Sequence, residues 1–334
     1  MKRLSLTLVT FCCVVVLTGL AAAQQVITPR SFTYVSIDVP CSACPGGSAR
    51  KTVANGINAG GEIVGTYNDA TGSQHGFLLS RGQYTTIDVP GSLRGVSGSL
   101  PTNARGINAA GEIVGSYVAP ADGSKECPTS TSAACIKGFL FSHGKFSSVL
   151  VAGHPGSIPQ RIGPDGSING CLHDYDLMAS MFGFQRTHFG DMTLMENGGE
   201  LAQASDMVPS SMNNGATPDR GTIVGLYMEM TTNRRRGYIV QNGIFTPYDP
   251  PDSIFTRIWD INPAGNMVGE FHDSAGKTHG FLQVAGEPSA VTIDYPEAVA
   301  TAAFGINPSG AIVGQYTDIS GKTHGFLAAP TTTN

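Results

Sequence analysis

Short apolar runs alternate with glycine-rich turns along most of the chain, and the alternation repeats. Each repeat reads Gly-Ile-Asn-x-x-Gly-x-Ile-Val-Gly, then a variable loop, then His-Gly-Phe-Leu, a short turn and Thr-Ile-Asp-x-Pro. Short apolar runs bounded by turn residues predict β-strands rather than helices. Self-similarity at a period of roughly 45–55 residues indicates a repeat array or a β-propeller.

The clearest repeat predicts four antiparallel strands joined by tight turns. We expect strands at 52–58, 62–68, 75–79 and 84–89, the last ended by Pro90. Glycine and Asx residues between them suit hairpin turns, and proline ends a strand because it has no N–H for the ladder. Four antiparallel strands per repeat form a propeller blade.

Two signatures within the repeat each occur six times. The second predicted strand contains Ile-Val-Gly or a close variant, and the third contains His-Gly-Phe or a close variant. The first signature lies at 63–65, 113–115, 168–170, 223–225, 267–269 and 312–314. The second lies at 75–77, 137–139, 182–184, 236–238, 279–281 and 324–326. The chain therefore contains six repeats.

The ends of the chain predict how the repeats are joined. The sixth repeat lacks a fourth strand after Phe326, whereas an extra strand of that type, 34–40, precedes the first repeat. We expect this N-terminal strand to complete the last blade and close the ring, which leaves only short outer edges. The fold class is then all-β, a six-bladed β-propeller. An open solenoid is the alternative, but it needs end caps and none is visible.

The repeats resemble those of the HAF family of bacterial extracellular repeat proteins, whose repeat carries His-Ala-Phe and a Gly-Ile-Asn-x-x-Gly-x-Val-Gly element. The resemblance covers most of the chain after its N-terminal segment. This sequence has Gly76 where the family has alanine, and the repeats at 160–185 and 216–239 fit less well. The resemblance implies a secreted repeat protein, and it brings no established activity and no catalytic residues to carry over to this sequence.

The first 23 residues have the organisation of a secretory signal peptide. A positive start at Lys2 and Arg3 precedes an apolar stretch, 4–20, and then small residues. We expect cleavage after Ala23, a secreted or periplasmic location, and one mature domain spanning 24–334. A membrane anchor is the alternative, but the stretch is short for a membrane span. No other segment is long enough, so we expect no membrane partner after cleavage.

Charge and motifs narrow the partners further. Loss of Lys2 and Arg3 with the leader removes two positive charges from a formal net charge of −5 and leaves −7. Nucleic acids require a basic footprint, so we expect no nucleic acid as a partner. We find no phosphate-binding loop, no nucleophile elbow and no metal-ligand spacing that a turn does not explain. We therefore expect no cofactor and no metal.

Five cysteines remain after processing, and an exported chain meets an oxidising compartment. Cys41 with Cys44, and Cys127 with Cys135, are the natural local disulfide pairs. The CxxC of Cys41 and Cys44 could also be a redox motif or half of a zinc site, but no second CxxC exists. Cys171 remains outside these pairs.

Variable loops on a rigid scaffold are where binding sites usually lie. Here they are the tips between second and third strands and the links between repeats, which share one face of a propeller. On that face, Arg234, Arg235 and Arg236 could bind a carboxylate, sulfate or phosphate, or they could form an ordinary solvated hairpin tip. The expanded tip at 119–136 contains the predicted pair Cys127 and Cys135.

The third repeat departs most from the pattern. Its His173, Asp174 and Asp176 follow Cys171 and could be metal ligands or an acid–base group. Asp174, however, aligns with aspartates that begin the tip turn in other repeats, and such a turn needs no metal. Other polar residues that recur once per repeat are expected to serve the blade: His75, His279, His324, Asn58, Asn108, Asn262 and Asn307.

The rim of the central channel is a further candidate site. The residue before each Gly-Ile-Asn element is expected to border the channel on the face that carries the tips. These residues are Asn55, Arg105, Gln160, Gly215, Trp259 and Phe304. Aromatic surface beside hydrogen-bonding groups suits a sugar or a peptide, although ordinary strand packing would also explain these positions.

These features predict a secreted, non-catalytic recognition or scaffold module, a monomer that binds a carbohydrate or protein ligand on one propeller face. The candidate ligand-binding residues are Arg105, Trp259, Phe304, Arg234, Arg235, Arg236, His173, Asp174 and Asp176. The alternative is an extracellular carbohydrate-active hydrolase or lyase, since one scaffold hosts many functions. Its acids would come from the third and fourth repeats, at Asp174, Asp176, Asp191 and Glu229.

Overall fold

The computed structural model describes residues 31–42, 44–91, 98–121, 134–151, 156–173, 181–187, 190, 192–195, 204–213, 221–229 and 231–331. The expected leader, 1–23, lies outside these residues. So do Cys127, Asp174, Asp176 and Asp191. Within the described ranges, no helix has the length and apolar character needed to cross a bilayer.

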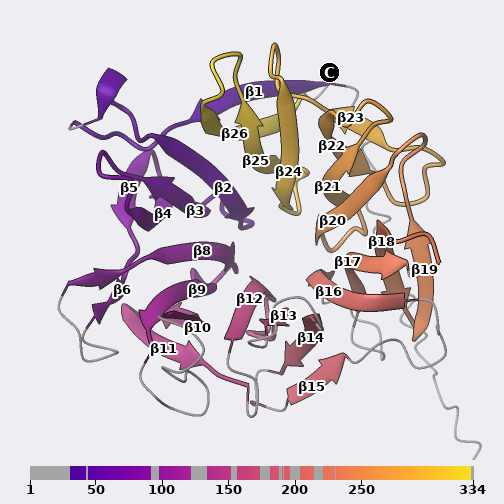
Figure 1. The fold of residues 1–334 in the computed structure, drawn as a ribbon, viewed down its shortest axis with the longest axis horizontal. Helices are drawn as coiled ribbons and strands as arrows, with labels where there is room; N and C mark the ends of the chain where they lie inside the picture. Colours follow the sequence, from indigo (N-terminus) through magenta and orange to yellow (C-terminus); the bar gives the residue numbers. More distant parts are fainter. Residues whose placement is uncertain are drawn as a thin grey trace, which may run out of the picture.

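Six four-stranded antiparallel sheets stand around a central axis, which confirms the six-bladed β-propeller (Figure 1). The first blade comprises β2 (Lys51–Ile57), β3 (Ile63–Asn68), β4 (Gln74–Ser80) and β5 (Gln83–Thr86); the second β8 (Thr102–Ile107), β9 (Ile113–Pro120), β10 (Ala134–Ser142) and β11 (Lys145–Val149). The third comprises β12 (Gly156–Ile162), β13 (Ile168–His173), β14 (Met181–Arg186) and β15 (Met192–Met195); the fourth β16 (Ala204–Asn213), β17 (Thr222–Glu229), β18 (Arg234–Gln241) and β19 (Ile244–Tyr248). The fifth comprises β20 (Phe255–Ile261), β21 (Met267–His272), β22 (Thr278–Gln283) and β23 (Val291–Ile293); the sixth β24 (Ala300–Ile306), β25 (Ile312–Thr317), β26 (Thr323–Pro330) and β1 (Phe32–Ile37).

The two ends of the described chain meet in the sixth blade. Strand β1 pairs antiparallel with β26, from Phe32 opposite Pro330 to Ile37 opposite Gly325. Figure 1 shows the indigo β1 lying along the outside of the yellow strands. The expected ring closure by the N-terminal strand is therefore present, although the strand begins and ends earlier than the predicted 34–40.

Each blade contains one buried aromatic ring directly opposite a glycine on the neighbouring strand. Gly65 of β3 pairs with Phe77 of β4, and the same pairing recurs in the other five blades. The six rings are fully buried: Phe77, Phe139, Phe184, Tyr238, Phe281 and Phe326. A Cβ at Gly65 would come within 2.7 Å of the Phe77 ring and 1.9 Å of the Val53 carbonyl oxygen. The Ile-Val-Gly glycine thus makes room for the ring of its own blade.

A second set of glycines makes room for the neighbouring blade. A Cβ at Gly138, in the element of β10 equivalent to His-Gly-Phe, would lie 2.7 Å from the Pro159 ring of β12 in the next blade. Isoleucine and valine side chains fill the space between blades, for example in a cluster that joins Val64 and Ile87 to Ile107 and Ile113. The hydrophobic core therefore lies between the sheets, as stacking of two-sided sheets requires.

One predicted strand end was wrong. The fourth strand of the first blade ends at Thr86, not at Val89. Val89 and Pro90 instead form β6, which pairs with β7 (Ser99–Leu100) in a small separate ladder. Between them, the Ile87 amide still donates to the Gly76 carbonyl oxygen of β4 at 2.9 Å, and the Ile87 side chain is buried in the core.

Candidate binding site at the central channel

The innermost strand of every blade contains a β-bulge at one position. In β2, Ala54 pairs with Gly65 and Gly56 with Val64, so the register skips Asn55. The register skips the equivalent residue in the other blades at Arg105, Gln160, Ser210, Trp259 and Phe304. The sequence-based assignment of Gly215 to this set was wrong, and Gly215 lies outside the described residues. Because a bulge re-aims a side chain, the first, second, third, fifth and sixth blades each place one such residue at the channel.

The residue after each bulge determines what fills the channel. It is Gly56, Gly106 and Gly305 where inner strands approach closely; a Cβ at Gly106 would lie 2.9 Å from the Cα of Arg161. At the equivalent positions of the third and fifth blades the chain has Arg161 and Asp260 instead. These two side chains occupy the space that the glycines leave open.

Arg161 crosses the channel and ties blades together. Its Nη1 donates hydrogen bonds to the carbonyl oxygens of Arg105 at 3.0 Å and Gln160 at 2.8 Å. Its Nη2 donates to the carbonyl oxygens of Asn55 at 3.0 Å and of Phe304. One guanidinium therefore bonds to the inner strands of the first, second, third and sixth blades.

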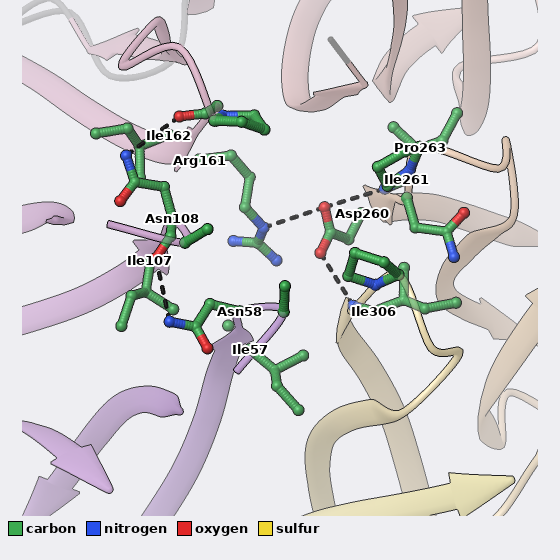
Figure 2. Close-up of a pocket in the computed structure, with 17 residues that line it drawn as sticks. Ile57, Asn58, Ile107, Asn108, Arg161, Ile162, Asp260, Ile261, Pro263 and Ile306 are labelled. Atoms are coloured by element: carbon green, nitrogen blue, oxygen red, sulfur yellow. Dashed lines mark hydrogen bonds and ion pairs between the residues drawn. The ribbon is translucent and has the colours of Figure 1, made fainter. Parts of the chain in front are cut away.

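Asp260 supplies the counter-charge from the fifth blade. Its Oδ1 lies 3.4 Å from Arg161 Nε, and both side chains are 11% exposed. Oδ1 also accepts from the Ile261 amide and Oδ2 from the Ile306 amide, each at 3.0 Å. Figure 2 shows Arg161 and Asp260 pointing toward one another across the channel. Because Arg161 lines a cavity on either side of itself, the pair divides the channel into two mouths.

One mouth opens on the face that carries the turns between first and second strands, such as 58–62, and we call this the turn face. Its cavity has a volume of about 130 Å³. The walls are mainly apolar, with one isoleucine from each of five blades: Ile57, Ile107, Ile162, Ile261 and Ile306. Figure 2 shows these side chains around the Arg161–Asp260 pair.

The asparagines at the turn face link neighbouring blades, from the fifth through the sixth, first and second to the third. Asn58 Oδ1 accepts from the Glu62 amide within its own turn, as a turn cap does, at 2.9 Å. Asn58 Nδ2 also donates to the carbonyl oxygen of Asn108 in the second blade at 3.1 Å. Asn307 of the sixth blade donates in the same way to the Asn58 carbonyl at 3.3 Å, across the closure of the ring. The recurrent asparagines are therefore turn caps, as expected, and also bridges between blades.

The other mouth opens on the face that carries the hairpin tips, such as 69–73, and we call this the tip face. Lys51 at this mouth pairs with Asn68, which precedes the tip. The tip-face cavity has a volume of about 210 Å³. Its lining is mostly polar: Lys51, Val53, Asn55, Thr66, Gln74, Asn103, Arg105, Gln160, Arg161, Trp259, Phe304 and Gln315. Five of the six residues named for the rim from sequence thus meet in one cavity.

Two aromatic rings lie together on the wall of the tip-face cavity. The Trp259 and Phe304 rings meet edge to face, with centroids 5.1 Å apart. The Arg257 guanidinium lies 3.5 Å from the centre of the Trp259 ring, and Trp259 Nε1 donates to Glu270 at 3.0 Å. One face of the indole is therefore already occupied by Arg257.

Arg105 is a half-buried cation that lines this cavity. Its Nη1 donates to Gln160 Oε1 at 3.1 Å, and its Nε is buried without a hydrogen-bond acceptor among the described residues. Gln160 Nε2 lies 3.6 Å from the buried Sγ of Cys171. Burial, together with the nearby charge of Arg161, lowers the pKa of Arg105, and Cys171 opposes this shift.

The three arginines of the fourth blade form a cluster that contains its own acids. Arg236 Nε contacts Asp249 at 2.6 Å, and its Nη1 contacts Glu229 at 2.7 Å. Arg234 lies 3.5 Å from the same Asp249 carboxylate, and only Arg235 is exposed. Hydrogen bonds from Thr232 and Arg236 lower the pKa of Glu229. The cluster is therefore not an open anion clamp, and Glu229 is held as a carboxylate.

The recurrent histidines connect the hairpin tip to the outer part of the blade in the first, fifth and sixth blades. His75 Nδ1 lies 2.6 Å from Asp88, and its Nε2 lies 3.5 Å from Asp69 in the tip. Asp69 also accepts hydrogen bonds from backbone amides of its own turn. The fifth and sixth blades repeat this bridge with His279 between Asp273 and Asp294, and with His324 between Asp318 and Asp38. These histidines serve the blade, as the sequence predicted.

The remaining candidates lie partly outside the described residues. Cys41 and Cys44 form the expected disulfide. Cys135 is disulfide-bonded, whereas Cys127 lies outside the described part of the chain. The backbone of His173 ends β13, and Asp174 and Asp176 are not described. Across the residues that are described, no group of three or more His, Cys, Asp or Glu side chains is placed to hold a metal.

Sequence reasoning missed the Arg161–Asp260 pair. The signal was present, because Gln160-Arg161-Ile162 and Trp259-Asp260-Ile261 carry charged residues where other repeats have the glycine of Gly-Ile-Asn. Their opposite charges indicate an ion pair only when the third and fifth blades are known to face each other across a closed ring. Lys51, Gln74 and Gln315, which reach the cavity from other strand positions, had no signal of this kind.

Comparisons with known proteins identify an architecture. No protein-family model and no curated protein matches the chain. Solved structures with a similar fold include AofleA from Arthrobotrys oligospora, which is 11% identical with a TM-score of 0.50 and covers 88% of this chain and 91% of its own. Trypanosoma rangeli sialidase in complex with the inhibitor DANA is 9% identical with a TM-score of 0.50 and covers 89% of this chain and 59% of its own.

A lectin from Aleuria aurantia, described as a six-bladed β-propeller with a novel mode of fucose recognition, is 13% identical with a TM-score of 0.47 and covers 85% of this chain and 96% of its own. At identities this low, likeness extends to the fold alone. The chain is therefore similar to six-bladed propellers in architecture, and the comparisons assign it to no family.

Proposed function

We propose that this chain is an exported, non-catalytic recognition module that binds a carbohydrate or protein ligand at the tip-face mouth of its central channel. The observation that carries the proposal is the tip-face cavity itself. Its wall combines two aromatic rings with side-chain amides at Asn55, Asn103 and Gln315. Aromatic surface with a few convergent polar groups is the usual composition of a ligand pocket.

The size and polarity of the cavity favour a sugar over a long peptide side chain. A volume of about 210 Å³ is below the roughly 300–1,000 Å³ of pockets for larger ligands, so one sugar unit is a suitable occupant. Side-chain amides both donate and accept hydrogen bonds, which matches the hydroxyl groups of a saccharide. Gln315 lines the cavity half-buried, and we assign it a direct contact with the ligand.

A hydrolase or lyase has less support at this cavity. Glycoside hydrolysis ordinarily needs two carboxyl groups that flank the bond to be cleaved. Among the described residues that line the tip-face cavity there is no carboxylate. Glu229, one of the acids considered for this chemistry, is bonded to Arg236 in the fourth blade. The propeller fold does not decide the matter, since solved propellers of this type include a sialidase.

The proposal is tested by a glycan array on the purified protein, followed by titration calorimetry with the best ligand. We expect Phe304→Ala and Gln315→Ala each to weaken binding about tenfold, because each removes a contact worth roughly 1–2 kcal/mol. Pro308→Ala is the matched control at the turn face, since the first and second blades carry alanine at that position. Unchanged affinity in both tip-face variants would place the ligand elsewhere.

A further inference from the structure

The tip-face cavity is positively charged. Its described lining includes Lys51, Arg105 and Arg161 and no aspartate or glutamate. The chain as a whole has a formal net charge of −5. Its composition therefore does not explain why three cations and no acid line one cavity. A cavity lined by one sign of charge raises the local concentration of ions of the opposite sign.

The three cations are not equivalent. Arg161 already faces Asp260 at 3.4 Å and donates to four carbonyl oxygens. Lys51 is exposed at the mouth and is therefore solvated. Arg105 remains, with one hydrogen bond to the neutral Gln160 and a buried Nε that has no acceptor. Of these three cations, Arg105 alone is half-buried with no ion pair to a carboxylate among the described residues.

Elsewhere the chain provides carboxylates for its buried arginines. Arg257 stands opposite Glu270 in the ladder of β20 and β21, and Arg236 contacts both Glu229 and Asp249. An unpaired buried charge costs several kcal/mol, so its retention at Arg105 needs a compensating partner. The Cys171 thiol near Gln160 would be an anion only if ionised. An external anion in the cavity that Arg105 lines would supply a counter-charge to its guanidinium.

We propose that the ligand unit in the tip-face cavity is an acidic sugar whose carboxylate is bound by Arg105, with Lys51 contributing charge at the mouth. This inference rests on the proposed function and names its ligand class. A planar guanidinium matches a carboxylate with two parallel hydrogen bonds. Asn55 Nδ2 already donates to Asn103 Oδ1 and to the Ala104 carbonyl oxygen. Asn55 Oδ1, Asn103 Nδ2 and the Gln315 amide then bind the hydroxyl groups of the same sugar unit. The half-buried position of Arg105 allows this carboxylate to interact strongly, because solvent screens it little.

The test compares three matched probes: disaccharides ending in glucuronate, in glucose, and in glucose 6-sulfate. We expect wild-type protein to bind the glucuronate probe at least about tenfold more tightly than the glucose probe, as a charge-assisted hydrogen bond implies. Arg105→Gln should abolish this preference while affinity for the glucose probe changes less than threefold. Arg105→Lys keeps the charge but cannot form two parallel hydrogen bonds to the carboxylate, so it should retain only part of the preference.

The outcomes separate the two proposals. Equal or tighter binding of the glucose probe would overturn the acidic-sugar assignment and leave the recognition function intact. Equally tight binding of the sulfated probe would overturn the carboxylate assignment. If the folded protein binds no glycan at all, both the acidic-sugar assignment and the proposed recognition of carbohydrate are overturned. Should Arg105→Gln fail to fold, Arg105→Lys and Lys51→Gln still decide, since an undiminished preference for the glucuronate probe in both variants contradicts the assignment.

Discussion

At the scale of single residues, a few side chains in the channel connect the blades to one another. Arg161 bonds to four blades and is neutralised by a fifth through Asp260, so one ion pair joins most of the ring. Burying such a pair is costly unless each charge is well satisfied. Here the guanidinium has four carbonyl acceptors and the carboxylate has two amide donors, which meets that condition.

Removal of one partner of this pair should be strongly destabilising. We expect Asp260→Asn to lower the free energy of unfolding by about 3–5 kcal/mol, because it leaves the Arg161 charge buried without its partner. Urea denaturation followed by intrinsic fluorescence measures the change. Asp252→Asn is the control, because Asp252 is exposed in a turn at φ 60° where asparagine is also tolerated. Similar midpoints for the two variants would contradict the role given to Asp260.

The His75 bridge makes stability depend on pH. Burial lowers the pKa of His75, but hydrogen bonds and charges from Asp88 and Asp69 outweigh burial and raise it. A raised pKa means that the bridge stabilises fully below the unfolded value of about 6.5 and loses this contribution as pH rises through the folded value.

We therefore expect His75→Gln to destabilise the protein more, and to lower Tm more, at about pH 5.5 than at about pH 8.5. The losses of unfolding free energy at the two pH values should differ by about 0.5 kcal/mol, as for a partly exposed pair. Thermal unfolding of both proteins at the two pH values measures it, and the other histidines cancel in the comparison. Hydrogen bonds within the tip turn, from Thr71 first, lower the pKa of Asp69 to about 2. Its contribution is therefore lost only as pH falls below about 4 toward that value. A loss in His75→Gln that is equal at both pH values would refute the bridge.

At the scale of elements, the blade is specified by pairs of residues on neighbouring strands. Glycine opposite a buried aromatic ring sets the register of second and third strands, since any side chain at Gly65 would collide with Phe77. The bulge in the innermost strand then aims one residue at the channel in the first, second, third, fifth and sixth blades. Strand positions and turns followed from the sequence because hairpin chemistry is local. The bulge did not, because it depends on how the inner strands crowd around a common axis.

The glycine opposite Phe77 gives a test of this packing. We expect Gly65→Ala to cost about 1–3 kcal/mol, since the added methyl overpacks a filled site. Gly60→Ala is the matched control in an exposed turn, because the second blade carries Ala110 at the equivalent position. The control should change stability by less than about 0.5 kcal/mol. Chemical denaturation of both variants distinguishes them, and equal costs would mean that the ring is not packed against Gly65.

At the scale of the whole molecule, one strand closes the ring. Strand β1 supplies the outer edge of a blade whose other strands come from the far end of the chain. The closure also places Asn307 beside Asn58 and Arg161 beside Phe304. The two channel mouths, and therefore the candidate site, exist only in the closed ring.

The seam can be tested by covalent cross-linking. Val35 lies directly opposite Leu327, within the Cα separation that a disulfide needs. We expect Val35→Cys with Leu327→Cys to form a disulfide on oxidation and to raise the free energy of unfolding by up to about 4 kcal/mol. Thiol titration and denaturation with and without reductant measure both effects. Val35→Cys with Ala329→Cys, a diagonal pair that is too far apart, should not cross-link; efficient bonding there instead would mean a different register.

The sequence by itself determined the number of blades, the strands and turns within each, the Cys41–Cys44 disulfide and the strand that closes the ring. These follow from local backbone preferences and from repetition, which need no knowledge of distant contacts. Only the tertiary structure decided that Arg161 and Asp260 meet across the channel, that the arginines at 234 and 236 are bonded to acids, and that Arg105 is half-buried beside an open cavity. The reason is physical: the environment of a charge depends on which groups surround it in space, and in a ring those groups come from blades far apart along the chain.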